Sequence, residues 1–502
     1  MSIAVQGAAL VSLVWSCAVF LVQTIGISQL FRHHSAPHPK PVSPTLKNDE
    51  VPHITLIRPV KGVEPRLYEC LASAFRLAYP KSKLTIYLCV ASTDDPAYPI
   101  LQDVVRNFPG FDAKVMVEQD DPLLHGTGGN VNNLGPNPKI RNMSRAYREA
   151  KGDIIWVVDC NVWIGTGSAG RMVDKLCGFQ PGGARTIPYK LVHQLPLVHD
   201  IDDPEAPEAQ GLLSHDNHSQ GRHPTGLLSH GGRLEEMFMS TSHAKFYGAI
   251  NTVCIAPCIV GKSTMFRKSH LDRFTDPSQN PILPASDASR GRGLDFFSSY
   301  ICEDHLIGDL IWRSSAGPGS RFGNHALVFG EWTVPAATLI EPGVEPSLCA
   351  LHFSFALTTL PWFRERVGIP QTWGAMALAW LGTVTVWMLV DRVVSNKLRR
   401  LQSVEVDEDT PSFARGSGRR GGIEQRPFGE WLAAWVGREL LALPIWTWAV
   451  LLGTTVAWRG KRFRVRMDMS VVAIDGETPS SSLLTPGADT SRPNSRSKDR
   501  VD

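Results

Sequence analysis

Residues 3–31, IAVQGAALVSLVWSCAVFLVQTIGISQLF, contain no charged side chain, and this run constrains the fold more than any other feature. A helix needs about 20 mostly apolar residues to cross the hydrocarbon core of a bilayer. A cleaved signal peptide would begin with basic residues and have a shorter apolar core. Here no basic residue precedes the run, whereas Arg32, Lys40 and Lys47 follow it. The sequence therefore predicts an uncleaved transmembrane anchor over residues 1–32, with the bulk of the chain in the cytosol.

The last third of the chain contains three more apolar segments. Residues 373–390 and 440–458 are each long enough to span a bilayer, and Pro444 is expected to bend the second. Residues 347–363 are shorter and include His352. This segment could span the bilayer, re-enter it or lie at its surface.

Basic residues cluster near these segments, at 397–400, 415–420 and 459–466. If all three clusters face the cytosol, one apolar segment must form a hairpin or lie flat on the membrane. We therefore expect a membrane-associated region over residues 336–460. A basic and then disordered tail is expected over residues 461–502.

The composition of the chain limits the kinds of partner. It has 502 residues and a formal net charge of +3, so its charge gives no indication of nucleic-acid binding. Its nine cysteines are scattered. Cys254 and Cys258 are close together, but no second pair completes a zinc site. A reduced, cytosol-facing chain is the simplest interpretation.

Between the apolar ends, strand-like and helix-like segments alternate. Residues 33–50 are rich in Pro, Ser and Lys and predict a linker. The region that follows, 51–335, is expected to be an α/β domain with a mostly parallel sheet covered by helices. Ligands of such sheets bind at the carboxyl ends of the strands. The strand-like segments are 53–60, 83–92, 113–119 and 153–164, and the helix-like segments include 65–80 and 140–152.

Residues 196–232 interrupt this alternation. They are polar, rich in His, Gly and Asp, and contain GLLSH twice. A flexible, solvated insertion is the favoured interpretation, and a metal site is the alternative.

Acidic residues lie in three places where an apolar strand or helix ends. Asp94 and Asp95 follow one predicted strand, and Asp159 and Asn161 form a D-x-N pair at the end of another. Side chains two residues apart in a strand point to the same face, so Asp159 and Asn161 offer two oxygen ligands together. Such ligands suit Mg²⁺ or Mn²⁺ bridging a diphosphate. The third site is the Glu303–Asp304 pair, which is also what a helix first turn would favour.

One basic residue precedes the second acidic site. Lys139, in NPKIRN, could contact a phosphate or hold a loop against one. Pro138 could equally mark an ordinary helix N-terminus. Spacing alone does not separate these two interpretations.

Several motifs in a fixed order resemble the fungal ceramide glucosyltransferases. They cover about residues 51–335 and continue loosely into the membrane segments. The insertion at 196–232 and the tail lie outside the resemblance. The motifs are RPVKGVEPRLYECLASAFRLAYP, ASTDDPA, NPKIRN, VDCNVWI, TSHAKFY, PCIVGKSTMFRKSHLD and YICEDHLIGDLIW.

The resemblance implies a GT-A-type nucleotide-sugar domain that transfers glucose from UDP-glucose to the primary hydroxyl of ceramide. By analogy with the family, Asp94 or Asp95 would bind the uridine nucleotide. Asp159 would serve the diphosphate and a metal, and Asp304 would be the general base. Lys139 would add positive charge near the leaving UDP. The resemblance also implies an integral protein of the Golgi or endoplasmic reticulum membrane.

Two further positions match family motifs. His243 in TSHAKFY and Cys258 in PCIVGKS correspond to residues linked in the family to nucleotide binding or inhibitor sensitivity. Their ordinary interpretations are a loop histidine and a small buried hydrophobic residue.

One family signature is missing. The family carries Gln or Arg, two residues, then Arg-Trp after the third acid, whereas this chain has no Arg-Trp dipeptide. The sequence passes from NHALVFGE directly to WTVPAATLIEP, between Glu331 and Trp332. The absent arginine would face the pyrophosphate, so the activity of this chain is in question.

Two alternatives remain beside a ceramide glucosyltransferase. A processive polysaccharide synthase shares the nucleotide-sugar domain, but it would need several closely packed spans to form a channel. An inactive, membrane-anchored relative is the second alternative, and the missing Arg-Trp tract favours it.

Overall fold

The computed structural model describes most of the chain, and every structural statement below refers to those residues. They are 2–125, 134–200, 231–254, 257–317, 321–328, 332–335, 346–448, 451, 453, 455–458, 461–466 and 470–474.

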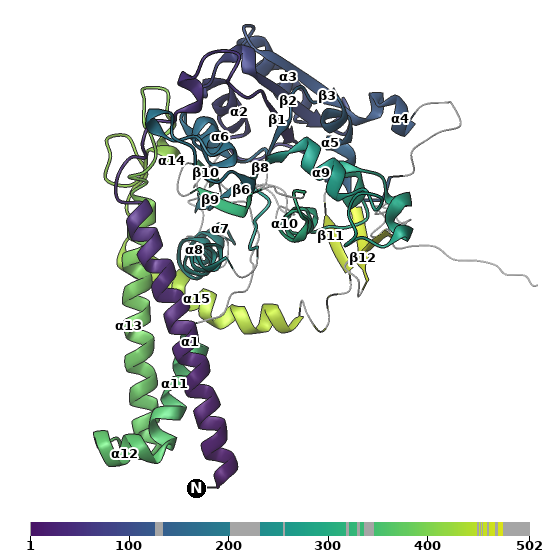
Figure 1. Cartoon of the computed structure of the whole chain (residues 1–502). Helices are drawn as coiled ribbons and strands as arrows, with labels where there is room; N and C mark the ends of the chain where they lie inside the picture. Colours follow the sequence, from purple (N-terminus) through teal and green to yellow (C-terminus); the bar gives the residue numbers. More distant parts are fainter. Residues whose placement is uncertain are drawn as a thin grey trace, which may run out of the picture.

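A seven-stranded sheet forms the centre of the upper domain in Figure 1, in the order β3-β2-β1-β4-β8-β6-β9. Strand β8 is antiparallel to both of its neighbours, and the other neighbouring pairs are parallel. The predicted α/β domain with a mostly parallel sheet is therefore confirmed. The strands are β1 (Ile54–Pro59), β2 (Leu84–Val90), β3 (Asp112–Val117), β4 (Ile154–Val158), β6 (Tyr189–Gln194), β8 (Ser263–Arg267) and β9 (Gly323–Val328).

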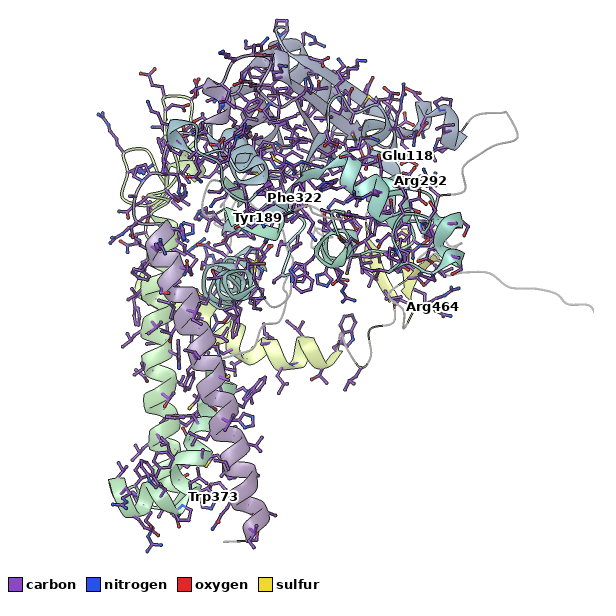
Figure 2. The ribbon with its side chains drawn as sticks, in the orientation of Figure 1. Glu118, Tyr189, Arg292, Phe322, Trp373 and Arg464 are labelled. Atoms are coloured by element: carbon purple, nitrogen blue, oxygen red, sulfur yellow. The ribbon has the colours of Figure 1, made fainter. Side chains whose placement is uncertain are left out.

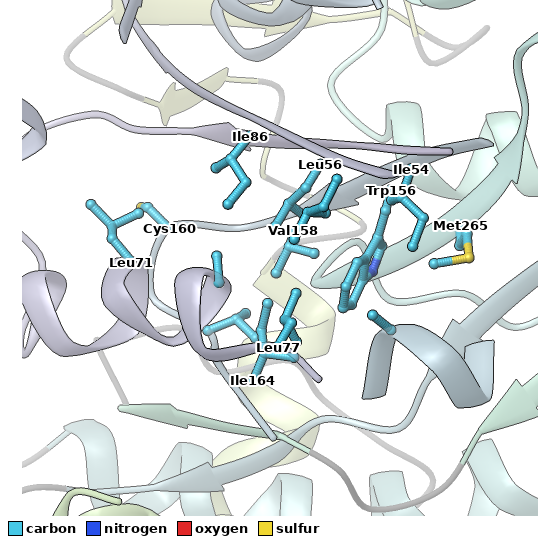
Figure 3. Packing of buried hydrophobic residues seen from close by; sticks show 14 of the residues in the cluster. Ile54, Leu56, Leu71, Leu77, Ile86, Trp156, Val158, Cys160, Ile164 and Met265 are labelled. Atoms are coloured by element: carbon cyan, nitrogen blue, oxygen red, sulfur yellow. The ribbon is translucent and has the colours of Figure 1, made fainter. Parts of the chain in front are cut away.

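The central strands are buried along their whole length because both faces of the sheet are covered. Every residue of β1, β2 and β4 is buried. Figure 3 shows Trp156 of β4 packed among Leu56, Leu77 and Met265. The indole N–H of Trp156 donates to Ser263 Oγ over 3.0 Å, so its polar atom is satisfied within the core.

The helices that carry the candidate site begin with recognisable signals. Pro138 occupies the first turn of α5 (Pro138–Arg148), and the Asn137 side chain accepts from the backbone N–H groups of Lys139 and Ile140. Glu303 and Asp304 lie in the first turn of α10 (Glu303–Arg313), where the helix dipole favours acids. Both helices lie where the sequence predicted them.

A second, three-stranded sheet joins distant parts of the domain. Strand β10 (Trp332–Pro335) is antiparallel to β5 (Trp163–Ile164) and parallel to β7 (Leu197–His199). Strand β7 and helix α7 (Gly231–Phe238) extend into both ends of the predicted insertion, whose residues 201–230 lie outside the described residues. Glu331, on one side of the junction where the Arg-Trp tract is missing, also lies outside them.

Three helices extend together away from the sheet domain in Figure 1: α1 (Ile3–His33), α11 (Pro346–Thr359) and α13 (Trp373–Arg399). Among the described helices, α1 and α13 are long and apolar enough to span a membrane. The short helix α12 (Pro361–Val367) connects α11 to α13 at the far end, so these two form a hairpin beside α1. The predicted N-terminal and C-terminal membrane helices are thus confirmed.

A buried polar cluster attaches these helices to the sheet domain. Lys245, in α8 (Ala244–Val253), donates to Asp391 of α13 over 2.5 Å and to Gln23 of α1 over 2.8 Å. The Trp435 indole donates to the second oxygen of Asp391 over 2.9 Å. Gln23 and Trp435 thus add hydrogen bonds to the two members of the ion pair, and such bonds help to offset the cost of burying charge.

In the part of 440–458 that the structure describes, no helix is among those long and apolar enough to span a membrane. Helix α15 (Phe428–Thr447) runs across the direction of α1 and α13 along the lower side of the sheet domain in Figure 1. Its Trp431 and Trp435 are buried in a cluster with residues of α7 and α13, which holds the helix there. This position of α15 agrees with the alternative in which one apolar segment lies flat, and the span over 440–458 stays a prediction.

The predicted tail also contains regular structure. Strands β11 (Thr455–Trp458), β12 (Lys461–Val465) and β13 (Val471–Ala473) form an antiparallel sheet. The backbone N–H of Val471 donates to the Ser299 carbonyl over 2.9 Å, just before α10. Ordered structure therefore continues beyond residue 461, where the sequence predicted a tail.

Candidate active site

Three carboxylates surround one ammonium group at the carboxyl edge of the sheet. Lys139 Nζ lies 3.1 Å from Asp159 Oδ1, 3.0 Å from Glu303 Oε1 and 2.7 Å from Asp304 Oδ2. Asp159 directly follows β4, and the other two carboxylates come from the first turn of α10. The fold thus brings together the second and third acidic sites and the lysine that the sequence analysis selected.

Arg58 holds the turn that carries Asp159. Its side chain is fully buried, and its Nη2 donates to the carbonyls of Asp159 over 2.9 Å, Cys160 over 3.0 Å and Val162 over 2.7 Å. Burial lowers the pKa of Arg58 to about 10, so the group remains charged at neutral pH. These carbonyls lie beyond the end of β4, and the Arg58 bonds satisfy them. The same bonds fix the backbone that positions the Asp159 carboxylate.

A second ammonium group lies on the other side of Asp159. Lys262 Nζ is 3.3 Å from Asp159 Oδ2 and 3.5 Å from Asn161 Oδ1. Lys262 directly precedes β8, and β8 is antiparallel to β4, so the pairing of these strands brings Lys262 beside Asp159. Burial acts to lower the pKa of Lys262, but Asp159 outweighs it and the pKa is raised.

Asp304 has a strongly perturbed carboxyl group. Three carboxylates and two ammonium groups would leave one net negative charge if all were ionised. Burial raises the pKa of Asp304 to about 8; Lys139 opposes this change, and the charges of Glu303 and Asp159 add to it. A carboxyl group with a pKa near neutrality, in hydrogen-bond contact with a cation, can accept or release a proton at neutral pH.

The backbone at Gly261 approaches Asp304 very closely. A Cβ atom at position 261 would lie 1.7 Å from Asp304 Oδ2, so no larger residue fits without moving the carboxylate. The Gly261 carbonyl also accepts from Lys139 Nζ at 3.5 Å. The segment before β8 therefore shapes the site through its backbone as well as through Lys262.

Asn137 links the two helices of the site. While its oxygen caps α5, its amide nitrogen donates to Glu303 Oε2 over 3.0 Å and to the Tyr300 carbonyl over 2.5 Å. Asn137 is fully buried. One side chain thus sets the position of the α5 N-terminus, and hence of Lys139, relative to the start of α10.

The two candidates of the first acidic site lie in different environments. Asp95 is buried and accepts from the backbone N–H groups of Gly62 at 3.0 Å and Ala97 at 3.0 Å. Asp94 is exposed, and its carboxylate accepts from the Ser92 hydroxyl over 3.3 Å. Asp95 therefore ties together the loops that follow β1 and β2, while Asp94 faces outward.

His243 and Cys258 lie apart from the acidic cluster. His243 ends a π-helical turn, Met239–His243, and its ring contacts the rings of Phe238 and Tyr247. Burial lowers the pKa of His243 to about 4, so it is neutral. Cys258 is half-buried, and its backbone bonds to the Asn251 side chain. The structure does not bring either residue into the Lys139 cluster.

The predicted metal ligands do not fit a divalent ion in this arrangement. Each Asp159 oxygen faces an ammonium group, Lys139 on one side and Lys262 on the other. Asn161 Oδ1 lies beside Lys262 as well. No group of three or more His, Cys, Asp or Glu side chains that could hold a metal occurs in the described part of the chain. A divalent ion at Asp159 would have to displace an ammonium group that already balances the carboxylate charge.

Sequence reasoning missed Arg58, Asn137 and Lys262 as site residues. Each lies within a motif that had been recognised, namely RPVKG, NPKIRN and PCIVGKS. The signal that could have identified them is a basic or amide side chain within a motif whose other residues are typical of a turn or a strand. Their partners could not be found from the sequence, because each contact joins segments that only the sheet order places side by side.

The chain is similar to known proteins over most of its length. The family model described as "Glycosyl transferase family 21" matches residues 10–202 and 331–471. A ceramide glucosyltransferase from Pyricularia oryzae is 54% identical, covering 94% of this chain and 96% of that protein. A ceramide glucosyltransferase from Gibberella zeae is 46% identical, covering 97% of this chain and 98% of that protein.

Among solved structures, the similarity is weak. A mannosyltransferase from Pyrobaculum calidifontis, in complex with GDP-Man and Mn²⁺, is 12% identical with a TM-score of 0.34. That match covers 79% of this chain and 85% of the other. A score this low supports no inference about ligands or mechanism.

Proposed function

The chain belongs to glycosyl transferase family 21, and from that premise we propose that it transfers glucose from UDP-glucose to the primary hydroxyl of ceramide. The product would be a β-glucoside, because the hydroxyl attacks the sugar carbon opposite the leaving UDP. The observation that carries the proposal is the Asp159–Lys139–Asp304 cluster at the carboxyl edge of the sheet. It combines an ionisable base with cationic groups suited to a leaving diphosphate.

Asp304 is the proposed general base. The ceramide hydroxyl must lose a proton as its oxygen attacks, and a carboxylate within hydrogen-bond reach can take that proton. Lys139 Nζ, 2.7 Å from Asp304 Oδ2, holds the carboxylate in place. Gly261, which has no side chain, leaves room for the Asp304 carboxylate beside Lys139.

Lys139 and Lys262 are the proposed donor-side cations. Negative charge grows on UDP as the glycosidic bond breaks, and fixed positive groups that meet it lower the barrier. Both ammonium groups are anchored on Asp159, which therefore serves the diphosphate through them. Asp95, which joins the loops after β1 and β2, and the exposed Asp94 remain the candidates for the uridine.

Three earlier expectations stay predictions. A divalent ion, Mg²⁺ or Mn²⁺, at Asp159 and Asn161 has no support from the arrangement of the residues, and no step is derived through it. The nucleotide-binding roles of His243 and Cys258 likewise rest on the family resemblance alone. The ring of His243 contacts Tyr247 and the backbone of Cys258 bonds to Asn251, and both of these partners belong to α8.

The lipid acceptor fits the position of the membrane helices. Helices α1 and α13 suggest that the chain is held in a bilayer, where ceramide is dissolved. Basic residues Arg32, Lys397, Arg399 and Arg400 lie at the ends of these helices nearest the sheet domain. By the positive-inside tendency, we propose that the sheet domain faces the cytosol from a Golgi or endoplasmic reticulum membrane.

An inactive relative is the second candidate, and the missing Arg-Trp tract favours it. Transfer of isotope from labelled UDP-glucose in cells that lack glucosylceramide separates the possibilities. Label in glucosylceramide supports the proposed function. Label in a polymer would instead favour a polysaccharide synthase, and no transfer by the intact, membrane-inserted chain would favour the inactive relative.

A further inference from the structure

Helix α15 has two unlike faces. Trp431, Ala434, Trp435, Arg438 and Ala442 are buried against the rest of the molecule. The opposite face carries large apolar side chains that are exposed in the isolated chain. They are Val436 at 41%, Leu440 at 69% and Leu443 at 61%, with Leu451 at 69% beyond the end of the helix. A helix on a water-facing surface would place polar residues there.

The strand that follows carries a second unusual surface. Arg462, Arg464 and Arg466 alternate along and just beyond β12, and all three are exposed. Phe463 between them is fully buried, so the arginines face away from the sheet domain. Within the described residues, no carboxylate lies within ion-pair distance of these arginines.

Two apolar residues share the arginine face. Strand β13 places Val472 opposite Arg464, and Ile474 bonds to Arg462 through the backbone. Val472 is 41% exposed and Ile474 43% exposed. Arginines mixed with exposed aliphatic side chains are typical of a surface that meets lipid headgroups.

Both surfaces lie on the side of the domain from which the membrane helices extend. In Figure 1, α15 runs across the direction of α1 and α13 at that side. Figure 2 shows Arg464 on the same lower side of the domain, with Trp373 at the far end of the membrane helices. Helix α15 and strand β12 therefore both lie on the side of the domain from which the candidate membrane helices extend.

We propose that α15 and the arginine face of β12 form a contact with an anionic membrane surface. The apolar stripe of α15 enters the boundary between headgroups and acyl chains, and Arg462, Arg464 and Arg466 bind the phosphates of acidic lipids. This inference rests on the membrane orientation proposed above. The partner of this surface is the membrane leaflet that faces the sheet domain.

The contact has a direct connection to the acidic cluster. The backbone of Val471, on the strand next to β12, bonds to Ser299, and Ser470 pairs with Tyr300. Tyr300 in turn accepts from Asn137, whose amide also bonds to Glu303. Lipid binding at β12 therefore steadies the segment that leads into Asp304, and we expect it to affect use of the lipid acceptor.

The test uses the full chain in nanodiscs made of phosphatidylcholine alone or of phosphatidylcholine with phosphatidylserine. Amide hydrogen exchange is measured over residues 461–466. Each arginine near an anionic surface contributes roughly a five-fold preference, so exchange should slow at least about five-fold with phosphatidylserine at low salt. The variant Arg462→Gln/Arg464→Gln/Arg466→Gln should lose that difference and show a raised KM for ceramide.

A matched control removes the same charge elsewhere. Lys81→Gln/Arg106→Gln/Lys114→Gln lies around β3 and α3 (Tyr98–Asn107), at the upper side of the domain in Figure 1, and should keep the lipid effect. Arg464→Lys keeps the positive charge and should keep most of the lipid effect. It therefore separates loss of charge from misfolding. Leu443→Asp should reduce it, because the apolar stripe no longer enters the bilayer.

Two results would overturn the proposal. One is equal exchange of residues 461–466 in the two kinds of nanodisc for the unaltered chain. The other is equal protection by soluble phosphoserine in phosphatidylcholine discs, which would indicate a site for free phosphate compounds. Neither result would bear on glucose transfer itself, which the isotope experiment measures separately.

Discussion

At the scale of single residues, Asp304 is distinguished by the charges around it. It shares Lys139 with Glu303 and Asp159, and burial together with those two charges raises its pKa to about 8. A base must be ionised to accept a proton, so this environment makes catalysis depend on pH. The same crowding makes the ionised cluster costly to the folded state.

The first prediction concerns this base. Asp304→Asn should slow transfer by about 10²- to 10⁴-fold while UDP-glucose binding is largely retained. In the unaltered chain, kcat/KM should rise as pH passes through about 8, since only ionised Asp304 can act. A pH-rate profile that is flat from neutral to mildly alkaline pH would contradict this role.

The pKa of Asp304 also predicts a stability change. The folded pKa lies above the usual value for an unfolded Asp, so the carboxyl group favours folding at low pH. That contribution is lost as pH rises through about 8. Asp304→Asn, which cannot ionise, should therefore raise the melting temperature at pH 8 and change it less at acid pH. Calorimetry of the two proteins at both pH values checks this.

The second prediction concerns Lys262 and the metal. Lys262→Gln should weaken UDP-glucose binding by about 10- to 100-fold, the usual effect of losing a charge-assisted hydrogen bond of about 1.5–3 kcal/mol. Lys114→Gln, at an exposed site on β3, is the control. Titration calorimetry with EDTA, and then with Mn²⁺, tests the metal. If the unaltered chain binds UDP-glucose only with Mn²⁺ and Asp159→Ala loses that Mn²⁺-dependent binding, Asp159 is a metal ligand after all.

At the scale of secondary-structure elements, the site depends on how α5 meets α10. Neither helix contributes all of the chemistry, since Lys139 comes from the first turn of α5 and the acids from the first turn of α10. Asn137 joins them by capping one and bonding the Glu303 side chain of the other. The relative position of the two helix starts therefore decides the distances within the cluster.

The third prediction separates these two functions of Asn137. Asn137→Ala removes both the cap and the bridge, and should cost about 1–2 kcal/mol of stability as well as lowering kcat. Asn137→Asp keeps the cap but adds a carboxylate beside Glu303, so it should lower kcat further for a smaller loss of helix stability. Denaturant unfolding and steady-state kinetics measure both. Equal kcat for the two variants and the unaltered chain would show that the bridge is not needed.

At the scale of the whole molecule, the sheet domain lies at one end of a bundle of apolar helices (Figure 1). Helix α11 leads away from the sheet domain and α13 leads back to it. The chain is therefore at the sheet domain both before and after this hairpin. The buried Lys245–Asp391 pair and its contact with Gln23 connect the bundle to the domain. This arrangement brings a membrane-dissolved acceptor and a water-soluble donor to one molecule.

The fourth prediction concerns this topology. Protease added to sealed microsomes should digest residues 51–335, because the proposed orientation places the sheet domain on the outside of the vesicles, which corresponds to the cytosol. The loop around α12 should be cleaved only after detergent is added. Protection of the sheet domain in intact vesicles would reverse the orientation.

The fifth prediction concerns the missing Arg-Trp tract. The chain without this tract should transfer glucose poorly. The leaving diphosphate lacks the charge-assisted hydrogen bond that the arginine of the tract would donate. Inserting the corresponding segment from a family relative between Glu331 and Trp332 should restore transfer. The same insertion in an Asp304→Asn background should not. Full activity of the chain without the insertion would show that the tract is dispensable here.

The sequence by itself determined the features that depend on local patterns. The uncharged run at 3–31 predicted α1, and the alternation of apolar segments predicted β1 to β4 and the helices between them. Placing Asp159 and Asp304 at element ends also followed from those patterns, because strand and helix lengths are set by nearby residues. The resemblance to a family depended on the order of several motifs, and that order can be read from the sequence without the structure.

Only the tertiary structure decided how these parts meet. Lys139, Asp159 and Asp304 lie far apart in the chain, and the order of strands in the sheet brings them within hydrogen-bond distance. Hydrophobicity made 440–458 resemble a span, but burial of Trp431 and Trp435 against α7 and α13 holds α15 across the bundle and leaves Leu440 and Leu443 exposed. The composition of the segment could not show which side chains meet protein, because an apolar side chain buries its surface equally well against lipid or protein.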